Sequence, residues 1–341
     1  MTPPLPSRRP RTVLAMDPSV SKALFDRMAL DRLTALADTD PSLVVEDFAD
    51  PALAQVLARA EALLTGWGCP PLTAGVLDRM PRLRTVVHAA GSVKHHITDA
   101  CWERGLTVAS AAAANALPVA EYTLAAILFS GKGVLAAERA YRDTRARISS
   151  IDLIGAGGNY RRTVGVVGAS RIGRRVIELL RPHDLRVLLY DPYVDEEEAA
   201  RLGVRPVPLD TLAVTSDVVT IHAPELPRTR HLFDRERLSL LPDGATLINT
   251  ARGSLVDTAA LTDELVSGRL NAVLDVTEPE VLPASSPLYD LPNVLLTPHV
   301  AGSLGNELLR VAHAALDELE RYGQGLPYAD PVWSEALTRS A

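Results

Sequence analysis

Two series of short apolar runs that alternate with helical stretches place the strongest constraint on how this chain of 341 residues can fold. In the first third, short apolar segments are separated by stretches whose apolar residues recur at helical spacing. Strands that alternate with helices predict a parallel sheet joined by right-handed crossovers. A second and more regular series begins at Thr163. The sequence therefore predicts an α/β fold with two doubly wound domains.

The expected elements follow from these patterns. In the first series we expect strands at residues 12–15, 43–46, 61–65, 84–88 and 106–109, and helices at 19–37 and 51–59. A long Ala- and Leu-rich helix is expected from Leu117 to about Arg147, with Pro118 in its first turn, followed by a glycine-rich loop at 149–160. In the second series we expect strands at 163–167, 186–190, 217–221, 245–249, 271–275 and 294–297, helices at 171–180, 195–202, 234–240 and 258–267, and a last amphipathic helix over about 302–322.

Composition narrows the class of protein. Hydrophobic residues make up 47% and charged residues 23%, which is ordinary for a globular chain. The net charge of −7 argues against a nucleic-acid partner. Cys69 and Cys101 fit no zinc spacing, so we expect free thiols and no metal site. No apolar run reaches the ~18 residues of a membrane span, and the Pro- and Arg-rich start does not resemble a signal peptide, so we expect a cytoplasmic protein with no membrane association.

A glycine turn opens the second series. Residues 163–173 read TVGVVGASRIG, in which Gly168 and Gly173 hold the first and last positions of a G-x-G-x-x-G turn between a strand and a helix. Ser170 stands at the middle position, where glycine normally lets the backbone approach a pyrophosphate. The helix N-terminus still offers unpaired N–H groups to a phosphate. A turn of this kind without any ligand is the alternative.

An acidic residue at the end of the next strand strengthens the cofactor interpretation. Asp191 lies about 20 residues beyond the turn, where a carboxylate can accept both ribose hydroxyls of an adenosine. It would repel a 2′-phosphate, and Pro192 offers no cation in its place, so the sequence favours NAD over NADP. The alternative is that Asp191 only caps a helix.

Three polar residues follow apolar strands in the second series. They are Arg252, Glu280 and His299. Ligands of open α/β sheets bind at the carboxyl ends of strands, so these residues form a plausible hydride-transfer site. A guanidinium can hold the carboxylate of a 2-keto acid, an imidazole can exchange a proton with the carbonyl oxygen, and a carboxylate can orient that imidazole. Taken singly, each residue has a plainer alternative: a surface arginine, a solvated acid and a buried structural histidine.

Together these segments resemble the D-isomer-specific 2-hydroxyacid dehydrogenases over most of the chain. The resemblance rests on residues 163–173, 219–224 with Thr229, 247–257, 272–280 and 292–299, and on Val119 to Glu121 at the start of a long inter-domain helix. It implies a Rossmann cofactor domain at 116–300 inserted into a flavodoxin-like substrate domain made of 1–115 and 301–341. It also implies homodimers joined through the cofactor domains. Because the chain ends at Ala341, we expect no C-terminal amino-acid-sensing domain.

The resemblance assigns roles to individual residues. Arg252 is implied as the substrate clamp, Glu280 as the partner of His299, and His299 as the acid/base. The implied NAD contacts are Gly168, Ser170, Arg171, Ile172, Gly173, Asp191, Ala223, Pro224, Thr229, Thr250, Ala251 and Asp275.

The loop at residues 90–96, AGSVKHH, departs from the family's usual G-x-G-x-D. We expect Gly91, Ser92, Val93 and Lys94 to bind substrate, with the N–H groups of Ser92 and Val93 holding its carboxylate. Lys94 and the histidines after it add positive character that would suit a second anionic group, such as a phosphate. A solvated loop and, less favoured, a metal site at His95 and His96 are the alternatives. A second departure is Val281, where proline is common.

The sequence therefore predicts an NAD-dependent oxidoreductase that interconverts a small 2-hydroxy acid and its 2-keto acid. Glyoxylate, hydroxypyruvate, a branched keto acid and a phosphonate-bearing acid all remain open, because a fold does not name a ligand. Formate oxidation is disfavoured, since formate dehydrogenases carry glutamine where Glu280 stands, whereas phosphite oxidation stays open. The alternative from another class is an NAD-sensing, corepressor-like interaction protein on the same scaffold.

Overall fold

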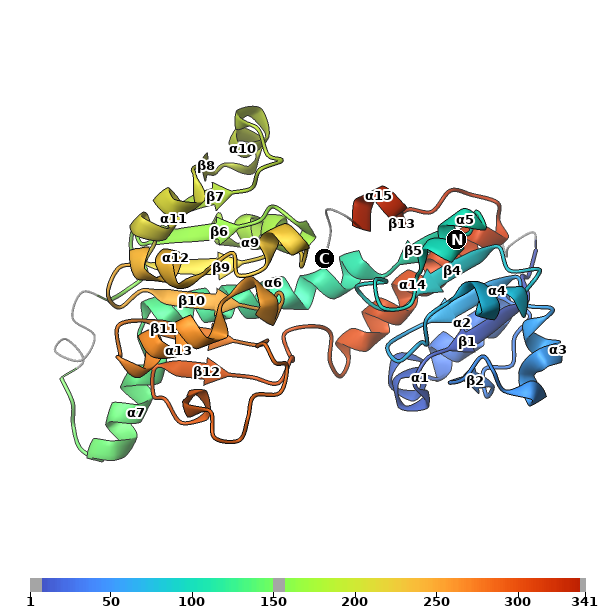
Figure 1. The fold of residues 1–341 in the computed structure, drawn as a ribbon, viewed down its shortest axis with the longest axis horizontal. Coiled ribbons are helices and arrows are strands. Elements are labelled where there is room, and N and C mark those ends of the chain that lie inside the picture. The colour runs from blue at the N-terminus through green and yellow to red at the C-terminus, as the bar shows by residue number, and fades with distance from the viewer. Residues whose placement is uncertain (1–7, 150–156, 338–341) are drawn as a thin grey trace. The chain divides into compact units, whose positions relative to one another are not determined.

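The computed structural model describes residues 8–149 and 157–337. Contacts divide the described residues into two units, 8–116 with 303–337 and 117–149 with 157–302, so the second is inserted into the first. The division falls within α6 (Ala112–Gly131). Each unit holds its own sheet with helices on both faces (Figure 1). The predicted α/β fold with two doubly wound domains is confirmed.

The sheet of the first unit has the strand order β13-β5-β4-β3-β1-β2. Its first five strands run parallel in the flavodoxin-like order 2-1-3-4-5. The edge strand β13 pairs with β5 in the antiparallel direction. The strands are β1 (Thr12–Ala15), β2 (Val44–Val45), β3 (Ala62–Thr65), β4 (Thr85–His88), β5 (Thr107–Ser110) and β13 (Pro331–Val332).

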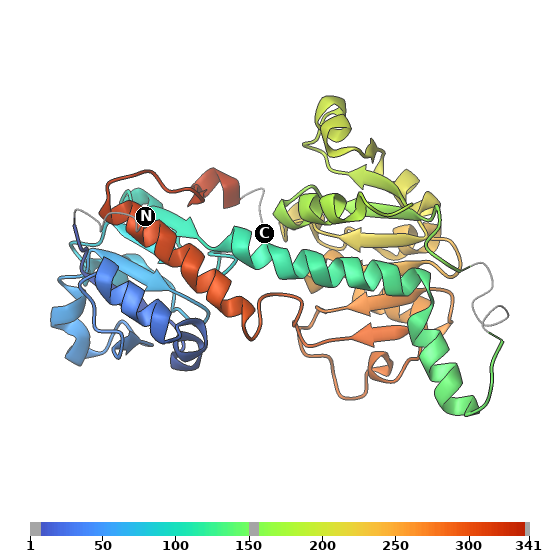
Figure 2. The same ribbon diagram turned by 180° about the vertical axis from the view of Figure 1, so that it is seen from behind.

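Alternating side chains give this sheet two apolar faces. In β1, Leu14 packs in one buried cluster while Val13 and Ala15 pack in the other, as the period of two along a strand requires. On the first face α2 and α14 lie side by side, which Figure 2 shows, and Arg32 of α2 bonds Asp317 and Glu320 of α14. The helical segments of this unit are α1 (Pro18–Leu24), α2 (Arg27–Leu36), η1 (Pro51–Leu53), α3 (Ala54–Leu57), α4 (Ala74–Asp78), α5 (Asp99–Glu103), α14 (Glu307–Gly323) and α15 (Ser334–Leu337).

The second unit has a parallel sheet in the order β12-β11-β10-β9-β6-β7-β8. Counted from its own first strand, this is the Rossmann order 3-2-1-4-5-6 with one strand added. The strands are β6 (Thr163–Val167), β7 (Arg186–Tyr190), β8 (Arg205–Pro206), β9 (Val218–Ile221), β10 (Thr246–Asn249), β11 (Asn271–Leu274) and β12 (Val294–Leu296).

Helices cover both faces of this second sheet as well. Buried residues of α6 and α9 pack on one face, and those of α11, α12 and α13 on the other. The helical segments of this unit are α7 (Val134–Thr144), α9 (Arg171–Leu180), α10 (Glu196–Leu202), α11 (Leu209–Thr215), η2 (Pro227–Thr229), α12 (Arg235–Leu240), η3 (Gly253–Leu255), α13 (Thr258–Val266) and η4 (Pro287–Tyr289).

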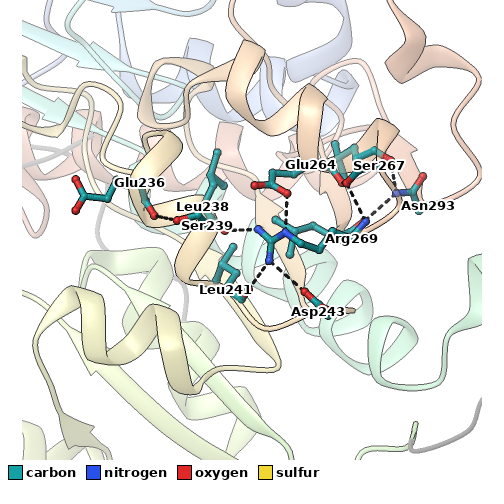
Figure 3. A network of polar contacts seen from close by, with 11 residues as sticks. Glu236, Leu238, Ser239, Leu241, Asp243, Glu264, Ser267, Arg269 and Asn293 are labelled. Atoms are coloured by element: carbon teal, nitrogen blue, oxygen red, sulfur yellow. Dashed lines mark hydrogen bonds and ion pairs between the residues drawn. The ribbon is translucent and has the colours of Figure 1, made fainter.

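An arginine ties together the amino-terminal edge of this sheet, opposite the strand exits. The Nε of Arg269 donates to Glu264 at 2.6 Å, and its two Nη atoms donate to the carbonyl oxygens of Leu241 and Leu238 at 2.6 and 2.7 Å. Figure 3 shows these contacts, together with the side chain of Asn293, which donates to the carbonyl of Leu265. The network connects α12, α13 and the start of β11. The polar side chains at this edge of the sheet therefore stabilise the fold.

Two helix predictions were wrong in their bounds. The helix expected at 19–37 is two helices, because Asp26 caps α2 by accepting the N–H of Ala29. The long helix begins at Ala112, so Pro118 lies in its interior and not in its first turn. The alanines that precede Pro118 extend the helix on its amino side, where the missing N–H costs one bond.

Other boundaries also differ from the predictions. The long helix ends at Gly131, and α7 starts after Gly133, whose φ of +57° breaks the run. The last long helix begins at Glu307 and not near Gly302. The short elements α4, α5, α11, α15, β8 and β13 were not predicted, because a few residues show no periodicity. The glycine-rich loop predicted at 149–160 lies partly outside the described residues.

One described helix, α6, is long and apolar enough to cross a membrane by length and composition alone. The apolar residues of α6 do not form one uninterrupted run, because polar residues such as Glu121 lie among them. Ala120, Ala126 and Ile127 of this helix pack in the buried core of the second unit. This packing is that of a core helix.

Candidate functional site

The glycine turn after β6 depends on both of its glycines. Gly168 has a φ of +98°, and a Cβ there would lie 2.8 Å from the N atom of Ala223. A Cβ on Gly173 would lie 2.0 Å from the carbonyl oxygen of Gly168. Because no side chain fits at either position, the turn can pack directly against the exit of β9.

Ser170 has a structural reason to replace the middle glycine. It is the N-cap of α9, and its hydroxyl accepts the N–H of Gly173 at 3.3 Å. Its φ of −63° needs no glycine. Arg171 is exposed and Ile172 is half-buried in the first turn of the helix. The turn therefore leads into a capped helix N-terminus whose positive end suits an anion.

Asp191 lies at the turn, as the sequence predicts for the end of the neighbouring strand. Its Oδ2 accepts the N–H of Ala169 at 2.7 Å, and its Oδ1 accepts the N–H of Tyr193 at 2.8 Å. The side chain thus joins the exit of β7 to the glycine turn. A carboxylate has about four acceptor positions, so two remain for further donors.

The exit of β9 carries Ala223, which is buried, and Pro224. The hydroxyl of Thr229 donates to the carbonyl of Pro224 at 2.6 Å and accepts the N–H of Leu226 at 2.9 Å. Thr229 therefore closes the loop that follows this strand. Its hydroxyl shapes the loop from within.

Arg252 is held by two residues that the sequence reasoning did not single out. The side chain of Asn249 accepts the N–H of Ala251 at 3.1 Å and donates to the carbonyl of Arg252 at 2.8 Å. A Cβ on Gly253 would lie 2.0 Å from the carbonyl carbon of Thr277, so this turn packs directly against the loop after β11. The available signal was an Asn at the end of an apolar strand and a glycine directly after the arginine.

Thr250 connects the same strand exit to the long helix. Its hydroxyl lies 3.1 Å from that of Thr123 in α6, and both residues are buried. This contact anchors the loop that carries Arg252 to α6.

The structure brings Glu280 and His299 together. The Nδ1 of His299 lies 2.7 Å from Oε1 of Glu280, and both side chains are at least half exposed. His299 has a φ of +55°, a conformation that non-glycine residues adopt only where the surroundings impose it. An imidazole held through Nδ1 keeps Nε2 available for a ligand.

Asp275 supplies those surroundings. It is 1% exposed, and its carboxylate accepts the hydroxyl of Thr297 at 2.7 Å and the N–H groups of Val300 and Ala301 at 2.8 and 2.9 Å. Its own carbonyl accepts the N–H of His299 at 2.9 Å. Asp275, which the sequence assigned to the cofactor path, thus fixes the loop that carries His299.

The loop at 91–96 in the first unit turns one histidine inward. His96 is 2% exposed and its Nε2 lies 3.3 Å from the hydroxyl of Thr65, while His95 is exposed. Burial lowers the pKa of His96 to about 4. The expectation that His96 adds positive charge here is therefore wrong, because its imidazole is neutral at neutral pH. The N–H of Lys94 donates to the Ser92 hydroxyl at 3.4 Å.

The described residues carry two free thiols, Cys69 and Cys101. Burial raises the pKa of Cys69 to about 12, which makes it unreactive at neutral pH. Within residues 8–149 and 157–337, no group of three or more His, Cys, Asp or Glu side chains is arranged to hold a metal ion.

Comparison with known proteins shows which family this chain resembles. The family model of the D-isomer specific 2-hydroxyacid dehydrogenase NAD binding domain matches residues 124–301. The D-3-phosphoglycerate dehydrogenase of Mycobacterium tuberculosis is 34% identical over 286 residues, which are 82% of this chain and 52% of that protein. The glyoxylate reductase of Korarchaeum cryptofilum is 32% identical over 257 residues, 75% of this chain and 77% of that protein.

A solved structure is also similar to this chain in sequence and in fold. The TT0316 protein from Thermus thermophilus is 30% identical, with a TM-score of 0.76 over 94% of this chain and all of that one. The chain spans about half the length of the phosphoglycerate dehydrogenases it matches. The glycine turn, the three polar strand exits and these similarities lead to one conclusion: this chain belongs to the D-isomer specific 2-hydroxyacid dehydrogenases, a family of NAD-binding oxidoreductases.

Proposed function

We propose that the protein interconverts a small 2-hydroxy acid and its 2-keto acid with NAD. The observation that carries the proposal is the pair formed by His299 and Glu280, whose side chains meet at 2.7 Å beyond the exits of β12 and β11. Arg252 follows the adjacent strand β10, and the glycine turn follows β6. Because these strands are parallel, all four features stand at the same edge of one sheet.

Each residue of the catalytic set has a separate task. Arg252 binds the substrate carboxylate and polarises the carbonyl oxygen. In reduction, His299 donates a proton to that oxygen as C2 receives the hydride that the bound nicotinamide supplies. In oxidation, the same imidazole takes the proton back. Glu280 accepts the Nδ1–H of His299, which orients the ring and stabilises its charged form.

The second unit, with 116–300 as its expected bounds, is the NAD-binding domain in this proposal. The pyrophosphate binds at the turn of Gly168, Ser170, Arg171, Ile172 and Gly173, where the N-terminus of α9 presents its positive end to an anion. Asp191 accepts the ribose hydroxyls. The remaining contacts toward the nicotinamide are Ala223, Pro224, Thr229, Thr250, Ala251 and Asp275. The guanidinium of Arg228 lies 5.7 Å from the ring of Tyr193, which is two residues beyond Asp191. A cation in this region would suit the 2′-phosphate of NADP, so NADPH is tested beside NADH.

The first unit, residues 1–115 with 301–341, is the substrate-binding domain. The N–H groups of Ser92 and Val93 have no acceptor among the described residues, and they bind the substrate carboxylate. A Cβ at Gly91 would lie 3.1 Å from the amide nitrogen of Asn115, so a larger residue there would have to displace that side chain. The names of the relatives, D-3-phosphoglycerate dehydrogenase and glyoxylate reductase, suggest both phosphorylated and unphosphorylated acids as substrates. Lys94 with His95 is the set that would contact a phosphate.

The test is NADH oxidation with glyoxylate, hydroxypyruvate, pyruvate, a branched keto acid and a phosphorylated keto acid, repeated with NADPH. We expect turnover with NADH on at least one acid, and its loss in the Arg252→Ala variant. NADH binding without turnover on any of them would contradict the enzyme and favour the NAD-sensing alternative.

We also propose that two copies associate through their second units. This unit carries a groove of about 560 Å³ whose lining is mainly apolar and includes Ala126, Phe129, Val134, Leu135 and Leu295. Helix α7, which supplies Val134 and Leu135 to this groove, has no buried residues. An uncovered apolar surface of this kind suits an isologous dimer. Light scattering tests it: we expect a dimer that Phe129→Glu converts to a monomer, and a monomeric wild type would contradict it.

The free thiols fit a reducing compartment, so a cytoplasmic location is part of the proposal.

A further inference from the structure

Three buried polar side chains that the proposed function does not use lie beneath the loop at 91–96. Thr65 ends β3, His88 ends β4, and the two residues stand opposite each other in the parallel pairing. His96 reaches them from the loop. The imidazole rings of His88 and His96 are 4.4 Å apart between centroids, at 40° to each other. All three residues are at most 3% exposed.

Their hydrogen bonds form one directed chain. Burial lowers the pKa of His88, and a backbone hydrogen bond with Ser92 opposes that lowering, as happens when a ring nitrogen donates to a carbonyl. Its Nδ1, 2.9 Å from the Thr65 hydroxyl, is then the acceptor of the neutral ring. Thr65 donates to it, and the Thr65 oxygen accepts the Nε2–H of His96 at 3.3 Å. The chain runs from His96 through Thr65 and His88 to Ser92.

Burial keeps both rings in the neutral form that this chain requires. Desolvation lowers the pKa of His96 to about 4 and that of His88 well below its usual value. Each neutral ring offers one donor and one acceptor, so the order that the bond of His88 to Ser92 sets is kept at neutral pH.

The backbone of the loop is anchored on the same inner side. The side chain of Val93 is buried, and its carbonyl accepts the N–H groups of His96 and Ile97 at 3.2 and 2.9 Å. The carbonyl of His96 accepts the N–H of Leu72 at 2.8 Å. Within the described part of the chain, the N–H groups of Ser92 and Val93 have no such anchor.

Planarity of the peptide connects the inner chain to these outer groups. The carbonyl of Ser92 and the N–H of Val93 belong to one trans peptide, so they point in opposite directions. When His88 holds that carbonyl inward, the N–H of Val93 must point outward. Rotation of this peptide would turn the N–H away and break the bond to His88.

We propose that Thr65, His88 and His96 are positioning residues that aim the N–H groups of Ser92 and Val93 at the substrate carboxylate. The proposal rests on the function proposed above and names what shapes its carboxylate subsite. It also gives a reason for histidine at position 96, which the sequence left as a choice between a solvated loop, an anion contact and a metal ligand.

The test compares Thr65→Val, which keeps the shape but removes the hydroxyl, with Thr65→Ser, which keeps the hydroxyl. With glyoxylate and NADH, we expect Thr65→Val to raise the KM for glyoxylate about ten-fold, while kcat changes less than about two-fold and the KM for NADH is unchanged. Thr65→Ser should behave as the wild type. Thr107→Val is the matched control, because its hydroxyl bonds the Arg84 carbonyl at the start of β5, away from the loop. If Thr65→Val does not fold, His88→Phe keeps a ring and removes the bond to Ser92.

Hydrogen–deuterium exchange gives a second readout that does not depend on turnover. We expect faster exchange in residues 89–98 of Thr65→Val and wild-type exchange in Thr65→Ser. Unchanged exchange in Thr65→Val would overturn the positioning role, as would an unchanged KM for glyoxylate in a variant whose loop exchanges faster. If the wild type reduces none of the acids, the proposed function fails, and the exchange result still decides whether the three residues position the loop.

Discussion

His299 and Glu280 meet at 2.7 Å although 19 positions separate them in the chain, and both side chains are open to solvent. The strained backbone of His299 is held by Asp275, whose buried carboxylate accepts two N–H groups of the following loop. The pair is therefore rigid on its inner side and accessible on its outer side. This is the arrangement that proton transfer to a bound ligand requires.

The first prediction concerns Glu280. In Glu280→Gln the imidazole keeps a hydrogen-bond acceptor but loses the carboxylate that stabilises its charged form. We expect kcat/KM to fall about ten- to a hundred-fold. The fall should be equal for reduction and oxidation, because a mutation cannot change the overall equilibrium. Steady-state kinetics in both directions check it, with Glu335→Gln, an exposed acid of the first unit, as control. Full activity of Glu280→Gln would remove Glu280 from the catalytic set.

The second prediction concerns Arg252. Arg252→Ala should lower kcat/KM about a thousand-fold, because a clamp that also polarises the carbonyl acts on both bound substrate and transition state. Arg252→Lys keeps the charge but not the planar fork, so it should recover only part of the loss. NADH affinity, measured by fluorescence titration, should stay unchanged in both variants. A lysine variant with wild-type kinetics would show that only the charge matters.

The sequence predicts the fold well where local patterns carry the information. Strands 12–15, 163–167 and 186–190 and the helix at 171–180 match the observed bounds, because apolar runs and a cap define them. The long helix was misplaced because a local rule about Pro118 was overridden by the alanines before it. Short helices such as α4 and α11 gave no periodic signal.

Within the candidate site too, the sequence predicts the features that depend on local patterns and misses those that depend on distant contacts. The spacing of Gly168, Gly173 and Asp191 encodes a turn that can be recognised in the sequence alone. The partners that shape the site are distant in the chain: Tyr122 and Thr297 are 175 positions apart, and Thr65 and His96 are 31 apart. No local pattern connects such pairs, so only the structure shows that His96 faces inward.

The third prediction tests the glycine turn. In Gly173→Ala the new Cβ would lie 2.0 Å from the carbonyl oxygen of Gly168, a backbone atom that can move only if the turn opens. We expect the Kd for NADH to rise more than about ten-fold and the Tm to fall. Gly75→Ala is the matched control, because its Cβ would meet nothing within 4 Å. NADH titration and thermal unfolding of both variants decide it. Wild-type affinity in Gly173→Ala would show that the turn tolerates opening.

The fourth prediction follows from a hydrogen-bond chain in the second unit. The Tyr122 hydroxyl lies 2.9 Å from that of Thr297, which donates to Asp275 at 2.7 Å. A carboxylate only accepts, so Tyr122 must donate to Thr297. Tyr122→Phe leaves that bond unmade, which should cost about 1 kcal/mol of stability and lower kcat about three- to ten-fold by loosening the loop of His299. Tyr141→Phe, on the exposed face of α7, should change neither. Unchanged kcat in Tyr122→Phe would limit the chain to a structural role.

The last prediction concerns acid stability of the first unit. His96 has a folded pKa of about 4 against about 6.5 in an unfolded chain, so between these values the unfolded state binds more protons. Stability should therefore be unaffected by His96 above pH ~6.5, fall by about 3 kcal/mol as the pH drops to ~4, and level off below that. All three tryptophans, Trp67, Trp102 and Trp333, lie in this unit, so their fluorescence reports its unfolding in urea.

Two variants isolate the contribution of His96 from that of other groups. His96→Gln should reduce the slope of the unfolding free energy between pH ~4 and ~6.5 by up to about 1.4 kcal/mol per pH unit, the equivalent of one proton. His95→Gln removes an exposed imidazole next to it and should change the slope much less, because burial is the larger cause of the lowered pKa of His96 and the charge of His95 the smaller one. The slope, and not the absolute stability, is the quantity compared, because the glutamine also changes packing. Equal slopes in the two variants would mean that His96 is protonated in the folded protein at the same pH as in the unfolded chain, and would contradict the neutral hydrogen-bond chain beneath the loop.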